Sequence, residues 1–389
     1  MKKIGLFRGQ ALYDVLPIEI DELATAFRDL GHDVQVVDLF APDVNEQFKR
    51  VLSPPADFIF AFNGMGSGIR VGNQSAFDAC RVLYMTLLVD HPMYIHDRVF
   101  PDVRHFQVFC IDRTHPVFLD RLFGGRVRAR FFPHGGSQAA VPGRPFAERD
   151  VDVLFAGSYY DFEAQRSGWK RLPGDAVKLM ETLAAVLLTA PERAQFDGIM
   201  EFWQSQGRVP DDALFREMVK LLPSVDKFVS GYRRLSALKQ LADAGIRVCV
   251  CGDGWDRSPL RGAPTFTFEA PRIYPDLLAL MTRSKVVLNL LPNFPDGSHE
   301  RVFSAMLNGA VSVSTHSRFL AETFMEGEDV LFYRWDRLAE LPAIVSQVLA
   351  QPERWKALAA AGQAKARAGH TWRHRAEQLI TLADAVRKD

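Results

Sequence analysis

Short apolar runs alternate with amphipathic segments along the first third of the chain. Strands are predicted where the apolar runs are buried and bounded by turn residues, at 4–7, 34–38, 58–62, 84–89, 108–111 and 128–132. Helices are predicted over 18–30, 46–52 and around 75–81. This alternation predicts an α/β domain, with a parallel sheet covered by helices on both faces.

A second α/β pattern begins after a linker near residue 145. Its first strand is predicted at 152–156, and 161–230 is helical only, with breaks at Pro173, Pro191 and Pro210. The later predicted elements are a helix at 233–244, strands at 247–251, 285–291, 310–314 and 330–333, and helices at 299–308, 320–326, 337–350 and 352–368. A last helix begins near Thr371. We therefore expect domains at 1–145 and 146–370, followed by a helix at 371–389.

Composition and charge narrow the class of protein. The 389 residues include 47 basic and 47 acidic side chains, so no global field favours nucleic acid as a partner. No run approaches the roughly 18 apolar residues that a membrane span needs, and the apolar run at the N-terminus ends too soon for a signal peptide. We expect a cytoplasmic protein without a transmembrane segment.

The cysteines agree with that location. Cys249 and Cys251 flank Val250 in a predicted strand, so their side chains lie on one face. They are either buried strand residues or metal ligands, and a lone C-x-C is a weak metal signal. Reduced thiols are typical of the cytoplasm.

The segment from 285 to 315 carries the clearest ligand-binding pattern. An apolar strand ends in a proline-rich loop at 292–298, and a helix then begins near His299. Glu300 and Arg301 lie in its first turn, and Asn308-Gly309 is a fitting C-terminal signal. A loop that enters such a helix is suited to hold a polar, anionic ligand.

Several motifs in order give the chain a family resemblance from Arg234 to about residue 380. They are the segments 252–255 (Gly-Asp-Gly-Trp), 274–278 (Tyr-Pro-Asp-Leu-Leu), 284–289 (Ser-Lys-Val-Val-Leu-Asn), 301–309 and 370–375. The chain resembles GT-B glycosyltransferases, especially the bacterial branch related to spore-maturation glycosyltransferases. The resemblance implies the GT-B fold: two Rossmann-like domains facing a cleft, here with a helical insert and a C-terminal helix that returns to the first domain. It also implies transfer of a sugar from a nucleotide sugar to a protein, glycan or small-molecule acceptor.

The resemblance implies a donor-binding set in the second domain. Its members are Gly157, Ser158, Gly252, Asp253, Trp255, Tyr274, Asn289, His299, Glu300, Arg301 and Ser304. The family usually has glutamate at the position of Ser304, and Glu300, one turn earlier, could substitute for it. No D-x-D strand end points to a bound metal, so we expect a metal-independent enzyme without a cofactor, in which helix N-termini and basic groups stabilise the diphosphate.

Alternatives remain open for several of these residues. His299 either contacts phosphate or caps its helix, and Trp255 either stacks on the ligand or packs in the core. Tyr274 is either a base-side contact or a core residue. Arg233 and its neighbour Arg234 are expected on an exposed helix face.

The first domain offers candidates for the acceptor side. Gly64 and Gly66 belong to a glycine-rich turn after a strand, with the wrong spacing for a dinucleotide motif. Asp90 and His91 follow another strand, where they would serve as general base or orient the acceptor, or else form a structural turn before Pro92. His134 ranks behind this pair.

Two other functions fit the same sequence. The substitution at Ser304 fits a nucleotide-sugar-binding or scaffold protein that has lost transfer, and a nucleotide-sugar epimerase can share the fold. The helical segment 161–230 would either recognise a partner or form a homodimer contact.

Overall fold

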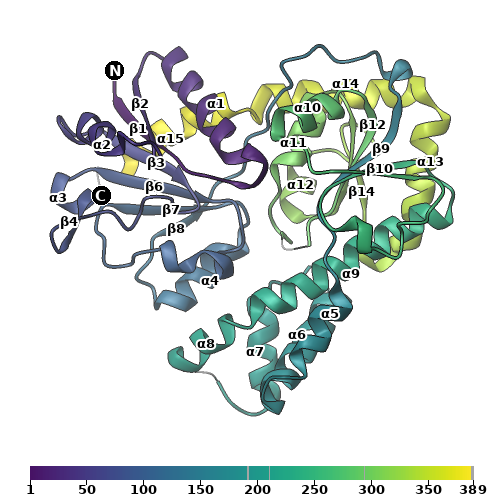
Figure 1. Ribbon diagram of the computed structural model, residues 1–389, viewed down its shortest axis with the longest axis horizontal. Helices are drawn as coiled ribbons and strands as arrows, with labels where there is room; N and C mark the ends of the chain where they lie inside the picture. Colours follow the sequence, from purple (N-terminus) through teal and green to yellow (C-terminus); the bar gives the residue numbers. More distant parts are fainter. Residues whose placement is uncertain (191, 210, 293, 387–389) are drawn as a thin grey trace. The chain divides into compact units, whose positions relative to one another are not determined.

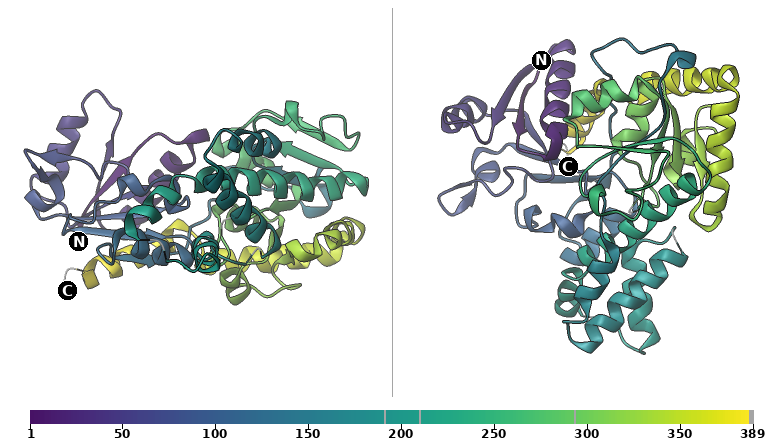
Figure 2. Two further views of the ribbon diagram at one scale, coloured as in Figure 1. Left: turned by 90° about the horizontal axis from the view of Figure 1, so that it is seen from below. Right: turned by 45° about the vertical axis from the view of Figure 1, so that its right-hand side comes forward.

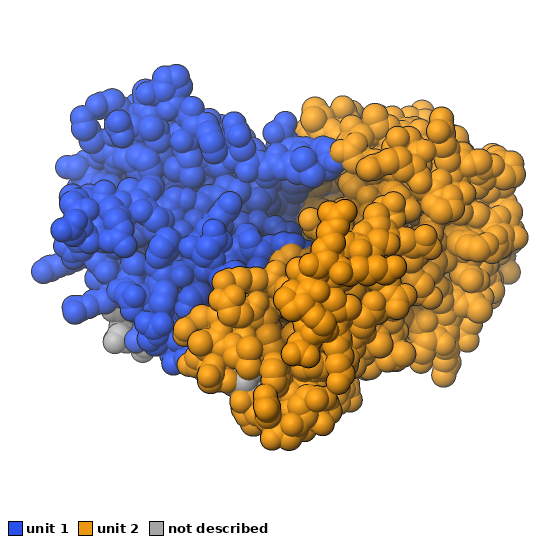
Figure 3. All heavy atoms as spheres, turned by 60° about the horizontal axis from the view of Figure 1, so that its bottom comes forward, with its two compact units in different colours: residues 1–137, 369–389 blue, residues 138–368 orange. Residues whose placement is uncertain are grey.

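The computed structural model of the chain describes residues 1–190, 192–209, 211–292 and 294–386. It divides into two compact units (Figure 3). Unit 1 comprises Met1–Ser137 and Gly369–Asp389, and unit 2 comprises Gln138–Ala368. The chain thus leaves unit 1 slightly before the expected boundary near 145, and the C-terminal helix belongs to unit 1 by its contacts.

Unit 1 is built on a six-stranded parallel sheet in the order β2-β1-β3-β6-β7-β8. Its strands are β1 Lys3–Arg8, β2 Asp33–Asp38, β3 Phe58–Phe62, β6 Leu83–Leu88, β7 Phe106–Cys110 and β8 Ala129–Phe131. A small hairpin pairs β4 Arg70–Val71 with β5 Gln74–Ser75. Every residue of β3 and β6 is buried, as expected for central parallel strands with helices on both faces.

The helices of unit 1 come from both ends of the chain. They are α1 Val15–Asp29, α2 Val44–Leu52, α3 Ala76–Cys80, α4 Thr114–Phe123 and α15 Trp372–Val386. Figures 1 and 2 show α15, the yellow C-terminal helix, close to α1, and the two helices are in contact. Lys2 and Asp384 also form an ion pair of 2.5 Å, which ties the two chain ends of the unit together.

Unit 2 has a second six-stranded parallel sheet, in the order β11-β10-β9-β12-β13-β14. Its strands are β9 Val151–Ala156, β10 Val248–Cys251, β11 Phe266–Glu269, β12 Ser284–Asn289, β13 Val311–Thr315 and β14 Leu331–Tyr333. Its covering helices are α10 Tyr274–Met281, α11 Glu300–Leu307, α12 Arg318–Thr323, α13 Leu341–Ala350 and α14 Pro352–Gly369. Counted from β9, the strand order is 3-2-1-4-5-6, the order of Rossmann domains.

Between β9 and β10 lies the helical insert. It consists of α5 Phe162–Trp169, α6 Gly174–Thr189, α7 Gln195–Ser205, α8 Asp212–Val219 and α9 Leu222–Asp243, and Figure 1 shows α6 to α8 projecting from the sheet of unit 2. The predicted break at Pro173 lies just before α6, whereas those at Pro191 and Pro210 fall outside the described residues.

Some sequence expectations about elements were wrong. The helix predicted from residue 233 begins at Leu222, because its N-terminal half continues the apolar stripe of the insert. Strand β11 and helix α4 were not predicted: β11 is a short edge strand with one fully buried residue, and α4 carries Pro116 near its start. The segment predicted to be helical at 320–326 is α12, which begins earlier because Ser317 caps it by accepting from the Leu320 N–H.

Three features of the described residues bear on the expected class. None of the helices in the described ranges combines the length and hydropathy that a bilayer span requires. All four cysteines are free thiols, and Cys249 and Cys251 are buried in β10. The same ranges contain no group of three or more His, Cys, Asp or Glu side chains placed to hold a metal ion, and metal independence stays a prediction.

Candidate functional site

The order in which strands are added to the sheet of unit 2 reverses between β9 and β12. From β9 the chain adds β10 and β11 on one side, and then returns to add β12 on the other. Ligands of open α/β sheets bind at the carboxyl ends of the strands beside such a switch point. Gly157 and Ser158 follow β9 there, and Asn289 ends β12.

Two arginines converge on the carboxyl end of β9. Arg301, in the first turn of α11, donates from Nη1 to the Ala156 carbonyl, and Arg234 of α9 donates from Nη1 to the Ser158 carbonyl at 2.6 Å. The Arg234 guanidinium also lies 4.6 Å from the ring centroid of Tyr160. Burial, together with the charge of Arg234, lowers the pKa of Arg301 to about 10, so the Arg301 guanidinium remains charged at neutral pH.

Neither of these two cations is paired with an acid of the described residues. Within the described part of the chain, neither Arg234 nor Arg301 forms an ion pair with a carboxylate; each is held by a backbone carbonyl. Placing like charges together costs free energy unless an anion neutralises them. Planar guanidiniums match phosphate oxygens with charge-assisted hydrogen bonds. The carboxyl end of β9 is therefore suited to a phosphate-bearing ligand.

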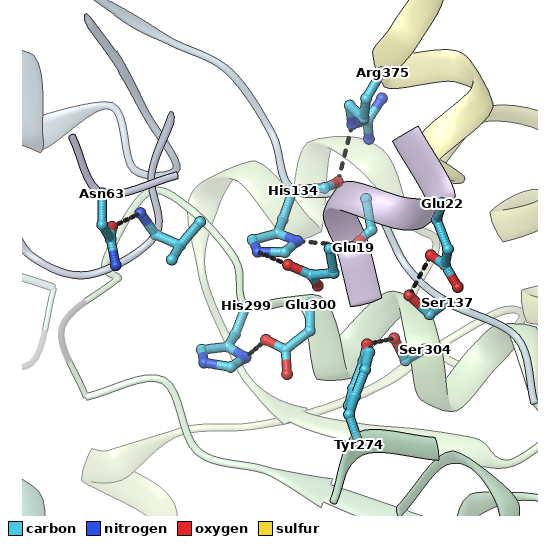
Figure 4. Close-up of polar contacts among 12 residues, drawn as sticks. Glu19, Glu22, Asn63, His134, Ser137, Tyr274, His299, Glu300, Ser304 and Arg375 are labelled. Atoms are coloured by element: carbon cyan, nitrogen blue, oxygen red, sulfur yellow. Dashed lines mark hydrogen bonds and ion pairs between the residues drawn. The ribbon is translucent and has the colours of Figure 1, made fainter. Parts of the chain in front are cut away.

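The first turn of α11 also carries an acid, Glu300, which is paired with His299. His299 is the N-cap residue, but its side chain makes no capping hydrogen bond; instead Nδ1 lies against the Glu300 carboxylate (Figure 4). Glu300 is only 5% exposed. The N-terminal end of a helix favours negative charge, so Glu300 lies in stabilising surroundings next to Arg301.

Ser304 occupies the next turn of α11 and is fully buried. Its hydroxyl lies 3.1 Å from the Tyr274 hydroxyl, which is equally buried (Figure 4). Of the two alternatives for Tyr274, the core position is the one observed. A buried hydroxyl pair in the α10–α11 contact does not replace the carboxylate that the resemblance implies at this position.

The turn after β10 braces the loop after β9. A Cβ at Gly252 would collide with the Gly157 carbonyl, so only glycine allows these two loops to touch. Trp255 donates from Nε1 to the same carbonyl at 2.7 Å and is 2% exposed, which is the packing alternative rather than stacking. Asp253 is exposed, and its carbonyl accepts from the Tyr159 N–H at 2.8 Å.

Asn289 links strands instead of presenting its amide to a ligand. Its Nδ2 donates to the Ser312 hydroxyl on β13 at 3.1 Å, and the side chain is buried. Its carbonyl accepts from the Tyr333 hydroxyl at 3.4 Å. These contacts fix where β12 ends, and with it the start of the loop that leads to α11.

In unit 1, Asp90 is held at the end of β6 by a neighbouring turn. Its Oδ2 accepts from Asn63 Nδ2 at 2.8 Å, while Asn63 Oδ1 accepts from the Val89 N–H. Desolvation raises the pKa of Asp90 above its ordinary value, opposed by the Asn63 hydrogen bond and by the charge of Arg98. A carboxylate with a raised pKa is a stronger base than usual.

His91 differs from Asp90. Its ring is buried, and Nδ1 accepts from the Met93 N–H at 3.1 Å, which caps a short 3₁₀ helix. Burial, with the neighbouring His115, lowers the pKa of His91 well below its ordinary value, so the imidazole is neutral. This is the structural-turn alternative.

The remaining unit 1 candidates separate into two places. Gly64 and Gly66 line a pocket of about 370 Å³ at the carboxyl edge of the sheet. His134 lies elsewhere. It is buried next to Glu19 of α1 (Figure 4), and its ring stacks beside Phe62 of β3. Burial lowers the pKa of His134 to about 4, and Arg375 donates to its carbonyl at 2.9 Å. His134 is therefore part of the core of unit 1.

Sequence reasoning missed Arg234 and misplaced Arg233. The expectation that Arg233 lies on an exposed face is wrong: it is 3% exposed, donating to the carbonyls of Leu187 and Pro292. Its spacing of four from both Val229 and Ala237, on one helical face, is the signal that predicts this burial. Arg234, one position later, points instead to the loop after β9.

Comparisons with known proteins agree with this architecture. Residues 233–381 match a family model described as glycosyl transferase-like. A comparison with curated protein sequences gave no significant match. Among solved structures, sucrose-phosphate synthase from Thermosynechococcus elongatus is 12% identical with a TM-score of 0.56, and each chain is 99% covered.

Two further structures are similar over the whole chain. An α-glucosyltransferase in complex with UDP-glucose and DNA is 9% identical with a TM-score of 0.61, covering 98% of this chain and 99% of that one. HepE of Anabaena, in complex with UDP and glucose, is 12% identical with a TM-score of 0.53, covering 99% and 100%. At these identities the similarity shows the fold. The chain has the α/β fold of GT-B glycosyltransferases, with two parallel-sheet Rossmann-like domains, as the sequence predicted. The expected cleft between the domains stays a prediction.

Proposed function

We propose that the chain is a glycosyltransferase that takes its sugar from a nucleotide-sugar donor bound at the carboxyl edge of the unit 2 sheet. The observation that carries the proposal is the pair Arg234 and Arg301, two guanidiniums at the end of β9 without a carboxylate partner among the described residues. The match of 233–381 to a glycosyl transferase-like family supports it, and this segment contains both arginines.

The proposed chemistry follows from the charges at this edge. When the bond from the anomeric carbon to the diphosphate oxygen breaks, negative charge grows on the leaving diphosphate. Arg234 and Arg301 would stabilise that charge, assisted by the N-terminal end of α11. Glu300, in the same turn as Arg301, is the carboxylate closest in sequence to these groups and would accept hydrogen bonds from sugar or ribose hydroxyls.

The acceptor is proposed to react on unit 1. Its hydroxyl oxygen would bond to the anomeric carbon while its proton passes to the Asp90 carboxylate, which Asn63 orients. The raised pKa of Asp90 supports this role more than the buried, neutral His91 does. We expect Asp90→Asn to lose transfer while it keeps donor binding. Full transfer by a folded Asp90→Asn variant would remove Asp90 from the proposal.

Binding measurements test the donor site. Calorimetric titration with UDP-, GDP-, dTDP-, ADP- and CMP-linked sugars should identify one nucleotide that binds to the wild-type chain in EDTA. Arg234→Gln and Arg301→Gln should each weaken it by about tenfold or more, because each removes a charge-assisted hydrogen bond. Arg216→Gln, at an exposed position of α8, is the matched control. Unchanged affinity in both folded variants would exclude this site.

One observation favours a second candidate, a nucleotide-sugar-binding protein without transfer activity. Ser304 replaces the carboxylate that the resemblance implies, and its hydroxyl is engaged with Tyr274. Donor hydrolysis separates the two functions: the enzyme should release nucleoside diphosphate slowly in water, whereas the binding protein should return the donor intact. With the first function we also propose that the chain belongs to the bacterial spore-maturation branch and that it acts in the cytoplasm.

A further inference from the structure

Unit 1 has its own pocket at the carboxyl edge of its sheet. It measures about 370 Å³ and lies where β1, β2 and β3 end. A pocket of this size is in the range that holds small molecules, and it is too small for a protein domain. Figure 1 shows the ends of these three neighbouring strands in the purple and blue part of the chain.

Apolar side chains form most of the pocket wall. Leu39 and Phe40 follow β2, Met65 belongs to the glycine-rich turn after β3, and Phe100 comes from the loop before β7. Phe40 is 63% exposed, so its ring is accessible to a ligand in the pocket. These groups would pack against a planar or aliphatic body of about one ring.

Arg98 supplies the charge of the pocket. Among the described residues that line it, Arg98 is the one charged side chain; Gln10 and Ser67 are its polar neighbours. Arg98 is exposed and donates from Nη1 to the Asn63 carbonyl at 3.3 Å. It forms no ion pair with a described carboxylate, and the other described lining residues are uncharged. That combination selects a ligand with an apolar body and an anionic group.

Asn63 connects the pocket to the proposed base through hydrogen bonds. Asn63 accepts from Arg98 through its carbonyl and donates to Asp90 through its side chain. Asn63 and Gly64 both have left-handed backbones, with φ 48° and 63°. In this turn the Asn63 carbonyl and the Asn63 side chain bond different residues. Arg98 and Asp90 thus share Asn63 as a hydrogen-bond partner, and the charge of Arg98 acts on the Asp90 carboxyl.

We propose that this pocket binds the acceptor, and that the acceptor is a small hydroxyl compound with a ring-sized apolar body and one anionic group. The anionic group pairs with Arg98, and the apolar body lies against Phe40, Met65 and Phe100. The hydroxyl is directed toward Asp90. That the ligand is an acceptor rests on the proposed function. The binding chemistry of the pocket rests on unit 1 alone.

Three probes test the ligand class without any nucleotide sugar. 4-Hydroxybenzoate carries the ring, the anion and the hydroxyl; 4-hydroxybenzamide lacks the charge; methyl β-glucoside lacks the apolar body. Binding is measured by saturation-transfer NMR and calorimetry on the full chain. We expect 4-hydroxybenzoate to bind about tenfold more tightly than the amide, as the loss of one charged hydrogen-bond pair predicts, and the glucoside to bind most weakly.

Variants connect that preference to the pocket. Arg98→Gln should abolish the difference between benzoate and benzamide, whereas Phe40→Ala, at an exposed site, should weaken both. Arg104→Gln is the control, because Arg104 is exposed on unit 1 and does not line the pocket. Binding of none of the probes, preference for the glucoside, or a benzoate preference that survives Arg98→Gln would overturn the inference. Because no donor is present, these results do not depend on the arginine pair of unit 2.

Discussion

Replacing Glu22 by glutamine is expected to stabilise unit 1 at alkaline pH. Glu22 lies on α1, and its carboxylate accepts from the Ser137 hydroxyl at 2.6 Å (Figure 4). Burial raises the pKa of Glu22 from its ordinary value of 4.5 to about 7, against the opposing effect of the Ser137 hydrogen bond. Ser137 is the residue at which the chain leaves unit 1, so this contact holds the exit of the unit.

The sign and size of the effect follow from linkage. A carboxyl whose folded pKa lies above its unfolded pKa destabilises the folded state once it ionises, so stability falls as pH rises from about 4.5 to about 7. At 1.36 kcal/mol per pKa unit the full difference is about 3 kcal/mol. Because Glu22 is partly exposed, water screens the effect, and we expect about 2 kcal/mol.

Glu19, one turn earlier on α1, responds in the same direction. It is fully buried, and burial, with the charge of Glu22 adding to it, raises the pKa of Glu19 well above its ordinary value. Neutralising Glu22 therefore also removes a repulsive charge from the surroundings of Glu19. His134 and Arg375 line the same region of unit 1, and the pKa of His134 near 4 keeps it neutral throughout this range.

Urea unfolding at pH 5 and pH 8.5 tests this prediction, because it gives the free energy of unfolding at each pH. Trp372 is the one tryptophan of unit 1, so the ¹⁹F resonance of Trp372 in 5-fluorotryptophan-labelled protein reports the unfolding of this unit. Glu22→Gln should match the wild type at pH 5 and exceed it by about 2 kcal/mol at pH 8.5. Glu46→Gln, at an exposed position of α2, is the control. Equal pH dependence in wild type and Glu22→Gln would refute the reasoning.

Three further substitutions probe the packing that positions the sites. Gly252→Ala should destabilise unit 2 by about 3 kcal/mol and weaken nucleotide binding, because its Cβ meets the Gly157 carbonyl, whereas Gly262→Ala, in open space, should change neither in calorimetry. Arg375→Leu should cost unit 1 about 3 kcal/mol in urea unfolding, since it leaves the carbonyls of His134 and Gly369 without their donor; a cost below 1 kcal/mol would contradict the buried contacts. Tyr274→Phe should cost about 1 kcal/mol with nucleotide affinity unchanged, and a large loss of affinity would instead make the Tyr274 hydroxyl a ligand contact.

Local patterns were sufficient to predict every strand of the two sheets except β11. The strands at 58–62 and 284–289 are short apolar runs between turn signals, and the parallel arrangement follows from their alternation with helices. Asn308-Gly309 predicted the end of α11, and Gly309 has φ 69° there. These signals act within a few residues, so they can be read without knowing the fold.

The site depends on contacts that local patterns do not encode. Arg301 was predicted from its place at a helix start, but Arg234 comes from α9, far away in sequence. The two reach the same strand end because β9 lies between β10, which follows α9, and β12, which precedes α11. Trp255 is a second example, for which the sequence left stacking on a ligand and packing in the core both open. It follows a strand at the ligand edge, yet its indole N–H is consumed by the Gly157 carbonyl.

A crystal structure of the chain with UDP, grown in EDTA, tests the donor site most directly. We expect the diphosphate oxygens to lie within hydrogen-bond distance of Arg234 and Arg301 at the carboxyl end of β9, with Glu300 near the ribose or the sugar position. A nucleotide bound with its diphosphate elsewhere, or contacts that leave both guanidiniums on their backbone carbonyls alone, would contradict it.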